Sequence, residues 1–239
     1  MKLKVLGSSS KGNCYLLASD SEVLIIEAGV KFTAVKKALS YDLSKIAGCL
    51  VSHQHADHAK YIKDIVECGI PTLALKDVWQ AKGLRDSRAV ECNSCALYAF
   101  GGFKVKAFPV CHDVPCVGFF IEHAECGRLV FITDTRSCDY DFPGLRTVMI
   151  EANYSHECLT RAMDEGRTNP SQGARTMETH MSLSGCEGWL RGQDLSKVET
   201  IVLLHLSDKN SDEKQFVSRI EGATGKCVYA ANQGMEIEL

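Results

Sequence analysis

Short apolar runs separated by polar turn residues dominate the first half of the chain. They lie at residues 2–6, 14–18, 23–27 and 48–51, and their lengths and bounding turns predict β-strands. Residues 32–39 and 59–68 instead carry apolar side chains at helical spacing, and Gly69 is placed to end the second helix. The first half is therefore expected to be strand-rich, with helices attached.

The second half continues this alternation. Strands are predicted at residues 71–75, 103–110, 117–122, 129–133, 148–151, 200–204, 227–230 and 235–238, with a hairpin turn within residues 123–127. Helices are predicted at residues 156–163, 183–190 and 212–220, whereas residues 164–179 look irregular. Because no repeat or linker divides the chain, we expect one domain over residues 1–239, an α/β fold in which helices cover two sheets.

The composition narrows the class of protein without identifying a substrate. Of the 239 residues, 45% are hydrophobic and 24% are charged, as in ordinary soluble globular proteins, and no apolar run is long enough to span a bilayer. The apolar start gives way to polar residues at Ser8, so we expect no export signal, a cytoplasmic location and reduced thiols for the 12 cysteines. The net charge of -3 leaves nucleic-acid binding to a local basic patch.

Polar residues with metal-binding or catalytic chemistry follow several of the predicted strands. His53, His112, Asp134, Glu151 and His205 each lie at or just beyond the C-terminal end of one. Residues at such strand ends commonly gather at one edge of a sheet and share a site. We therefore expect these side chains to lie close together.

The densest group of ligand-type residues is a single loop. His53, His55, Asp57 and His58 supply imidazoles and a carboxylate that suit zinc, and also manganese or iron. In an extended loop His53 and His55 point the same way, so Asp57 and His58 can turn toward a second metal. The alternative is a solvated loop in which Asp57 only caps the next helix, and it accounts poorly for so many ligand-type residues in one place.

A two-metal site needs further ligands and an anionic group that bridges the ions. His112, Asp134 and His205 are the candidates. Taken singly, each is better explained as a hydrogen-bonded residue at a strand end. Taken together with the loop, they complete a site for two divalent metal ions.

The order and spacing of these residues resemble the metallo-β-lactamase superfamily across essentially the whole chain. The resemblance is carried by the run His53-x-His55-x-Asp57-His58, followed by His112, Asp134 and His205. It implies a four-layer αββα sandwich with the metals at one edge. It also implies two sets of metal ligands bridged by Asp134: His53, His55 and His112 for one ion, and Asp57, His58 and His205 for the other.

Further segments resemble the small YycJ/WalJ-type exonuclease branch of that superfamily. They lie at residues 7–14, 111–113, 133–135, 151–153, 180–182 and 204–207. Asp134 argues against a true β-lactamase, since two-zinc lactam-cleaving relatives generally carry cysteine there. The chain departs from the branch at Glu27, where aspartate is usual, and at Tyr154 and Ser155, which replace histidine and aspartate. These departures bear on substrate and activity more than on metal binding.

The resemblance also indicates a proton donor. His180 stands where phosphodiesterase members place an acidic histidine, and Glu151 where they place the glutamate that orients it. A carboxylate beside an imidazole favours the protonated form that a general acid requires. In the alternative interpretation, His180 caps the following helix and Glu151 is a solvated strand end. The candidate catalytic residues are thus Asp57, His180 and Glu151, with Asp57 also a metal ligand.

The expected reaction is phosphodiester hydrolysis by a hydroxide that bridges two metals. The branch resemblance favours a nuclease that degrades DNA from a 5′ end. The alternatives are a small-molecule phosphodiesterase, a thioester or lactone hydrolase, and a non-catalytic metal-binding domain; the oligomeric state is left open. A nuclease should gather basic residues in a groove beside the metals. The candidates are Lys11, Lys60, Lys63, Arg136, Arg161, Arg167 and Arg175.

Overall fold

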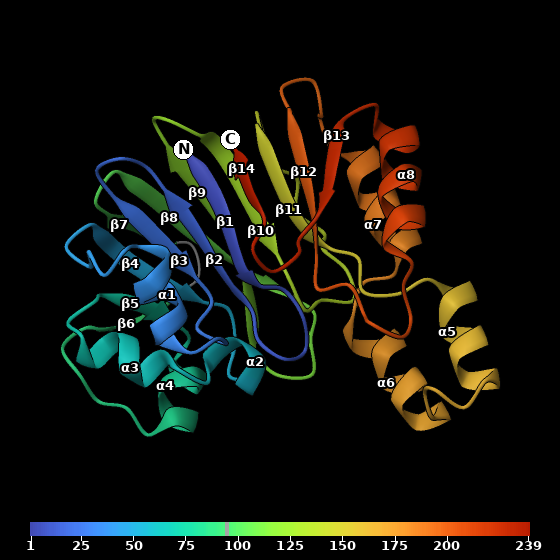
Figure 1. Ribbon diagram of the computed structural model, residues 1–239, viewed down its shortest axis with the longest axis horizontal. Coiled ribbons are helices and arrows are strands. Elements are labelled where there is room, and N and C mark those ends of the chain that lie inside the picture. The colour runs from blue at the N-terminus through green and yellow to red at the C-terminus, as the bar shows by residue number, and fades with distance from the viewer. Residues whose placement is uncertain (94–95) are drawn as a thin grey trace.

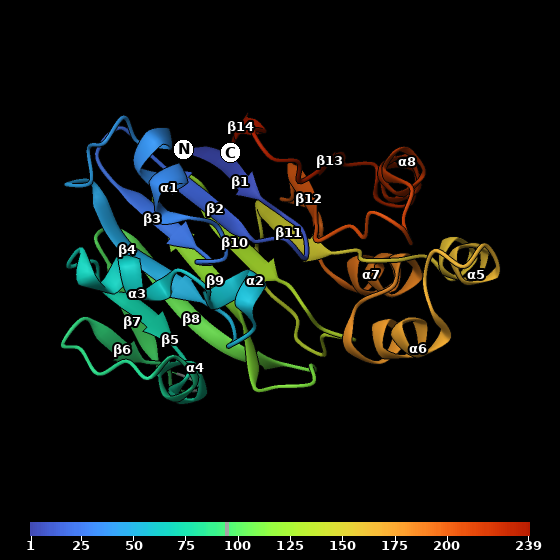
Figure 2. The same cartoon turned by 60° about the horizontal axis from the view of Figure 1, so that its bottom comes forward.

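The computed structural model describes residues 1–93 and 96–239. Two seven-stranded sheets pack face to face and helices cover their outer faces, which gives layers in the order α, β, β, α (Figures 1 and 2). The first strand pairs with the last, so the two termini lie together at one end (Figure 1). The αββα sandwich expected from the sequence is confirmed.

The first sheet comes mainly from the N-terminal part of the chain. In spatial order its strands are β14 (Glu236–Glu238), β1 (Lys2–Gly7), β2 (Cys14–Ala18), β3 (Val23–Ile26), β4 (Ile46–Val51), β5 (Thr72–Ala74) and β6 (Ala89–Glu91). Strands β3 to β6 are parallel, so their C-terminal ends share one edge. The short helix α2 (Ala56–Ala59) follows β4 at that edge.

The second sheet comes from the rest of the chain. In spatial order its strands are β13 (Cys227–Ala230), β12 (Thr200–Leu204), β11 (Thr147–Glu151), β10 (Gly127–Ile132), β9 (Cys116–His123), β8 (Phe103–Val110) and β7 (Leu97–Phe100). Strands β10 to β13 are parallel, and β8 runs in the same direction because two antiparallel pairings separate it from β10. The C-terminal ends of β8, β10, β11 and β12 therefore share one edge.

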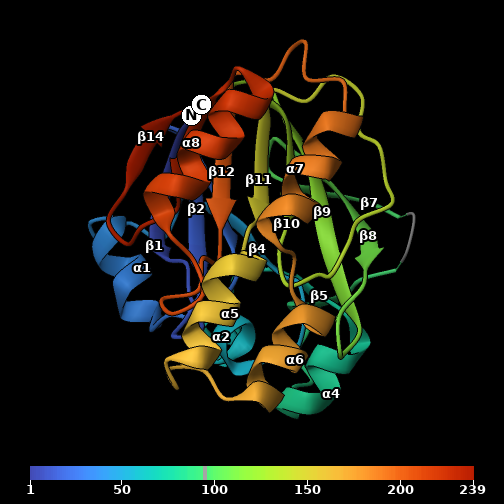
Figure 3. The same ribbon diagram turned by 90° about the vertical axis from the view of Figure 1, so that its right-hand side faces the viewer.

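Helices close both faces of the sandwich and one of its ends. The first sheet is covered by α1 (Phe32–Ala38), α3 (Ile62–Glu67) and α4 (Lys76–Lys82). The second sheet is covered by α7 (Leu183–Gly192) and α8 (Glu213–Thr224). The remaining pair, α5 (His156–Asp164) and α6 (Pro170–Thr179), lies at the same end as α2, beyond the ends of β10 to β12 (Figure 3). None of the described helices is long and apolar enough to cross a membrane.

Strand β2 shows why the sequences of the strands are almost entirely apolar. Tyr15 and Leu17 face the core between the two sheets, whereas Cys14 and Leu16 face the helices outside. Since both faces of each sheet are covered, both sets of alternating side chains must be apolar. Within the described residues every cysteine is a free thiol, and most are buried.

The predicted strands and helices are mostly present, with local differences. The segment expected to be irregular contains helix α6, which begins with the side chain of Asn169 accepting a hydrogen bond from the Gln172 N–H, and with Pro170 in the first turn. An asparagine cap followed by proline is a recognised helix start, so the sequence did carry this information. The helix expected over residues 59–68 is divided into α2 and α3, and α4, β6 and β7 were not predicted.

Candidate dinuclear metal centre

The strand-end residues meet at the shared edge of the two sheets. His53 and His205 follow β4 and β12, while His112 and Asp134 follow β8 and β10. Two groups of ligand atoms result, each with its members within 4.8 Å of one another. One group is His53, His55, His112 and Asp134, and the other is Asp57, His58, Asp134 and His205. These are the seven residues that the sequence predicted as ligands.

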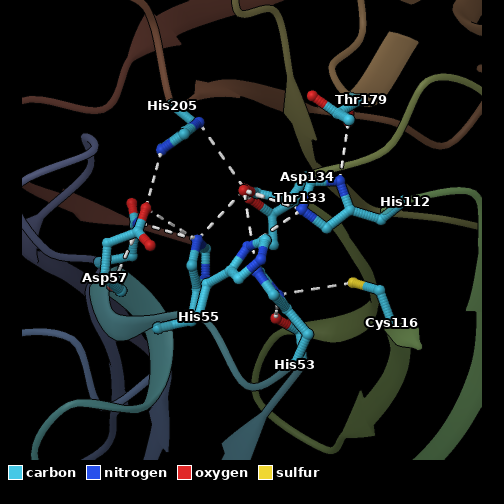
Figure 4. A network of polar contacts seen from close by, with 12 residues as sticks. His53, His55, Asp57, His112, Cys116, Thr133, Asp134, Thr179 and His205 are labelled. Atoms are coloured by element: carbon cyan, nitrogen blue, oxygen red, sulfur yellow. Dashed lines mark hydrogen bonds and ion pairs between the residues drawn. The ribbon is translucent and has the colours of Figure 1, made fainter. Parts of the chain in front are cut away.

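Asp134 belongs to both groups and lies between them (Figure 4). Its Oδ2 atom is 3.9 Å from His53 Nε2 and 3.8 Å from His112 Nε2. Its Oδ1 atom is 3.2 Å from His58 Nε2 and accepts a hydrogen bond from the Thr133 hydroxyl. Each carboxylate oxygen therefore faces a different group, which is the arrangement of a bridging ligand.

The backbone turns sharply where these strands end. Asp134 and His205 have φ values of 45° and 53°, a left-handed conformation that side chains other than glycine rarely adopt. Glu27, at the end of β3, has a φ of 70°. Such positions cost on the order of 1 kcal/mol each and persist where the surroundings hold them. Here the turn directs each side chain back into the edge of the sandwich.

Buried ring nitrogens test whether metal ions fit this cluster. His53 Nε2 and His205 Nε2 are buried and have no hydrogen-bond partner among the described residues. An unpaired buried polar atom of this kind costs about 1–3 kcal/mol, and a bound cation removes the cost. The neighbouring donors are imidazoles and the carboxylates of Asp57 and Asp134, which suit zinc, manganese or iron. The fold and this cluster together indicate a dinuclear metal site.

Hydrogen bonds behind the cluster fix the orientation of its histidines. His112 Nδ1 is 2.9 Å from the carbonyl oxygen of Thr179, and because a carbonyl only accepts, the proton must be on Nδ1 and Nε2 is left for a metal. His53 Nδ1 pairs with the Ser52 hydroxyl at 2.9 Å, which again leaves Nε2 facing the cluster. Such outer partners raise the affinity of a metal site by holding each ligand in place.

Glu27, where the exonuclease branch usually has aspartate, contacts His58 as an ion-pair partner rather than through a hydrogen bond. Its side chain is fully buried, and Oε2 lies 3.4 Å from His58 Nδ1 while Oε1 accepts a hydrogen bond from the Ser52 N–H. Burial raises the pKa of the Glu27 carboxyl, and the neighbouring His58 acts in the opposite direction. The longer side chain at this position thus keeps its contact with the histidine.

His180 and Glu151 form a close pair beside the cluster. His180 Nδ1 is 2.7 Å from Glu151 Oε1, and Glu151 Oε2 accepts from the N–H groups of Thr135 and Met181. Burial disfavours a protonated His180, but the charge of Glu151 outweighs it and raises the pKa of the imidazole. Glu151 is fully buried, and Ser182 caps the helix that follows. Glu151 is therefore not a solvated strand end, and His180 is not the cap of the helix that follows it.

A third group of ligand-type atoms overlaps the first two. It combines Asp134 and His205 with Glu151 and His180. Both oxygens of Glu151 already accept hydrogen bonds from the groups just described, which makes this group a poorer cation site than the other two. Its arrangement is better suited to holding a proton on His180.

Five of the seven candidate ligands and His180 line one pocket of about 390 Å³. Gln172, Arg175 and Thr176 of helix α6 and Ser10 of the loop between β1 and β2 also line it. The pocket therefore combines candidate metal ligands with a histidine of raised pKa. This combination can polarise a bound ester and supply a proton to its leaving oxygen.

Comparison with known proteins places this arrangement in a family. Residues 23–206 match the model of the Beta-lactamase superfamily domain. The chain belongs to the metallo-β-lactamase superfamily. Among curated relatives it is 26% identical to the exodeoxyribonuclease YycJ of Bacillus anthracis over 172 residues, covering 66% of this chain and 65% of the relative, just under two thirds of its length. It is 24% identical to the exodeoxyribonuclease WalJ of Streptococcus pneumoniae over 228 residues, covering 88% and 83%.

Several solved structures share its architecture at low identity. YhfI from Bacillus subtilis superposes with a TM-score of 0.77 at 17% identity, covering 100% of this chain and 99% of the other. A diphosphatase of the PhnP family gives a TM-score of 0.69 at 15% identity, with 100% and 96% covered. The short form of human tRNase Z gives 0.63 at 15% identity, with 99% and 98% covered. These likenesses establish the fold.

The basic residues predicted to flank the metals in this metallo-β-lactamase-fold protein gather only in part. Arg175 lines the metal pocket, Lys11 lines an adjoining pocket, and the Lys60 ammonium lies over the ring of Tyr61 in that second pocket. Three other predicted basic residues lie away from these two pockets. They are Lys63, paired with Glu67; Arg167, paired with Glu165; and Arg161, in a shallow depression on α5.

One residue of this superfamily member was not assigned a role from the sequence. Asp113 directly follows His112 and contacts both His112 Nε2, at 3.2 Å, and His55 Nε2, at 3.4 Å. Its other oxygen is bound by Arg175 of α6. The sequence indicated it only by its place next to a predicted ligand, within the segment 111–113 that resembles the exonuclease branch; its contact with Arg175, 62 residues away, had no such signal.

Proposed function

We propose that this metallo-β-lactamase-fold protein is a two-metal phosphodiesterase that degrades nucleic acid, with DNA as the favoured substrate and a 5′ end as the point of attack. The observation that carries the proposal is the contact of 2.7 Å between His180 Nδ1 and Glu151 Oε1 beside the metal cluster. We also infer that residues 1–239 act as one hydrolase domain. The cytoplasmic location stays a prediction from the sequence.

The proposed metal ligands are the two groups that share Asp134. His53, His55 and His112 would hold one divalent cation, and Asp57, His58 and His205 the other. Zinc is favoured, with manganese or iron as alternatives, because the donors are imidazoles and carboxylates. The bound cations would supply the nucleophile and the Lewis acid.

His180 is assigned the role of proton donor. Its Nδ1 is engaged by Glu151, so Nε2 is the ring nitrogen left to donate toward the pocket that it lines. A departing alcohol of a phosphodiester needs a proton, and a positioned acid contributes about 10²–10⁴-fold to such a step. This need favours a phosphodiester over a thioester, whose thiolate leaves without one.

Nucleic acid is favoured over a small phosphodiester for two reasons. The curated relatives named above are exodeoxyribonucleases. In addition, the pocket opens between Arg175 of α6 and the loop that carries Lys11, both largely exposed side chains that can contact a phosphate backbone.

Hydrolysis assays with two substrates test this function. The metal-loaded protein is given bis-p-nitrophenyl phosphate and 5′-labelled single- and double-stranded DNA, with Zn²⁺ or Mn²⁺. The same assays are run on His180→Ala and on His156→Ala, an exposed histidine of α5 that serves as the matched control. We expect cleavage of both substrates, and a loss of DNA cleavage in His180→Ala alone at unchanged metal content.

Other outcomes have defined meanings. Cleavage of bis-p-nitrophenyl phosphate without cleavage of any DNA would indicate a small-molecule phosphodiesterase. A fully metallated protein that cleaves no phosphodiester would overturn the proposal and leave a thioester or lactone hydrolase, or a metal-binding role.

A further inference from the structure

A second pocket adjoins the metal pocket across the loop between β1 and β2. Its volume is about 600 Å³, and it is lined by that loop and by residues that follow β3, β12 and β13. We propose that this pocket binds one nucleotide of a single-stranded DNA substrate, next to the phosphate that is cleaved. This inference rests on the proposed nuclease function and names a subsite for it.

The two pockets share one wall, the loop at residues 8–12. Ser10 of this loop lines the metal pocket, whereas Ser9 and Lys11 line the second pocket. Ser8 also lines the second pocket, and its hydroxyl oxygen accepts hydrogen bonds from the His205 N–H at 3.0 Å and from the Tyr15 hydroxyl at 2.7 Å. A DNA strand bound at the metals would therefore reach the second pocket directly on the other side of this loop.

The lining of the second pocket offers the chemistry that a nucleotide needs. Tyr61 presents a half-buried aromatic ring, and the Lys60 ammonium lies 5.5 Å from the centre of that ring. Aromatic rings stack on nucleobases regardless of sequence, and nearby cations bind the phosphate backbone. Lys31 and Ser207 also line the pocket and can contact sugar and phosphate oxygens, whereas the Ser211 hydroxyl already donates to the Ser207 carbonyl oxygen.

The carboxylates in the lining already have partners. Asp208 lies 3.2 Å from the ammonium of Lys11, and Glu213 accepts a hydrogen bond from the Asn232 side-chain amide at 3.0 Å. The Lys11 and Asp208 side chains are largely exposed, so a phosphate can replace Asp208 as the partner of Lys11 at little cost. The acidic residues are thus compatible with an anionic ligand.

The volume of the pocket suits a single nucleotide and is too small for a base-paired duplex. Small-molecule sites commonly enclose about 300–1,000 Å³, and this pocket lies within that range. A stacked base must be unpaired to reach Tyr61, so the proposal specifies single-stranded DNA.

Binding without cleavage tests the role of Tyr61. Fluorescence anisotropy of a fluorescein-labelled oligodeoxythymidylate is measured in EDTA for the native chain, Tyr61→Leu, Tyr61→Phe and the control Tyr41→Leu. Tyr41 is an exposed tyrosine outside both pockets. Loss of one stacking interaction should weaken binding about tenfold in Tyr61→Leu. Tyr61→Phe and Tyr41→Leu should bind as the native chain does, and equal affinities for all four proteins would overturn the proposal.

A charge substitution tests the pocket even if Tyr61→Leu fails to fold. The measured quantity is the slope of log Kd against log salt concentration. Lys31→Gln should reduce this slope by about 1, as expected for the loss of one phosphate contact. Lys45→Gln, in a different surface depression, should leave the slope unchanged. Identical salt slopes for the two variants would contradict the proposal.

Cleavage of bis-p-nitrophenyl phosphate separates this inference from the proposed function, because that substrate has no nucleoside to fill the second pocket. If this hydrolysis occurs but the Tyr61 and Lys31 variants bind DNA normally, only the subsite is wrong. If no hydrolysis occurs with any metal, the proposed function itself fails.

Discussion

Asp113 Oδ1 lies 3.4 Å from His55 Nε2 and 3.2 Å from His112 Nε2, and so contacts two candidate metal ligands. The other ring nitrogen, His55 Nδ1, lies 3.3 Å from His112 Nε2. Asp113 Oδ2 is in turn 2.7 Å from Arg175 Nη2 of helix α6. One carboxylate therefore connects a candidate metal ligand to the helix that walls the pocket.

Replacing Asp113 is expected to weaken metal binding. Asp113→Asn removes the charge that orients His55, and loss of such an outer partner typically costs about 10–100-fold in metal affinity. Competition with a chromogenic chelator measures the change, with Asp139→Asn, an exposed residue of the β10–β11 loop, as the control. Equal affinities for the two variants would show that Asp113 is dispensable for the metals.

The role of His180 predicts a dependence on the leaving group. For a series of aryl phosphodiesters, His180→Ala should lose little activity with p-nitrophenol, whose anion departs without a proton, and about 10²-fold or more with poorly acidic alcohols. The measurement is the slope of log(kcat/KM) against leaving-group pKa, which should be steeper in the variant. Parallel slopes would indicate that His180 acts on the metals or the fold instead.

Metal binding is expected to release protons. Burial opposes protonation of His205, but Asp134 and the other carboxylates around it raise its pKa to about 10, and the pKa of His58 is raised well above its usual range by Asp134 and Glu27 despite burial. In the metal-free protein both rings are therefore protonated at neutral pH. Since a metal binds the neutral ring, affinity should fall as pH falls.

Calorimetric titration with Zn²⁺ at pH 7 in buffers of different ionisation enthalpy counts these protons. A heat of binding that is the same in every buffer would contradict protonation of His58 and His205 before metal binding.

A contact far from the metals predicts a pH-dependent part of stability. Glu22 accepts hydrogen bonds from the Gly102 N–H and from His123 Nε2, and it joins the β2–β3 turn of one sheet to the second sheet. Partial burial acts to raise the pKa of Glu22, but these two donors lower it overall from 4.5. The carboxylate therefore stabilises the fold above pH 4.5, and this stabilisation is lost as pH falls through the lowered value.

Glu22→Gln should reduce the free energy of unfolding at neutral pH by up to about 1 kcal/mol, since solvent screens this partly exposed group. Urea unfolding at a series of pH values measures the difference between variant and native chain, which should shrink below pH 4. The control is Glu67→Gln, whose partner Lys63 is exposed. A difference that does not change with pH would show that the charge of Glu22 is not involved.

Helix α6 shows where reasoning from the sequence was insufficient. Its residues are mostly polar, with a glycine at 173, so hydrophobic spacing gave little indication of a helix. The Gly173 backbone packs against the side chain of Met163 in α5, and the His112 ring binds the last residue of α6. These contacts come from remote parts of the chain and stabilise a segment whose own composition does not.

The sequence by itself determined the layered fold and the set of candidate metal ligands. Strands that are apolar along their whole length require a sheet covered on both faces. Histidine and aspartate residues that follow such strands are recognisable in the sequence as potential metal ligands, because strand ends of this kind commonly form a shared site. Tertiary structure decided what surrounds those ligands. The contacts of Asp113 with Arg175 and of Ser8 with His205, and the pocket around Tyr61, join segments far apart in the chain. Local pattern cannot determine such neighbours, because they depend on how the sheets and helices pack in space.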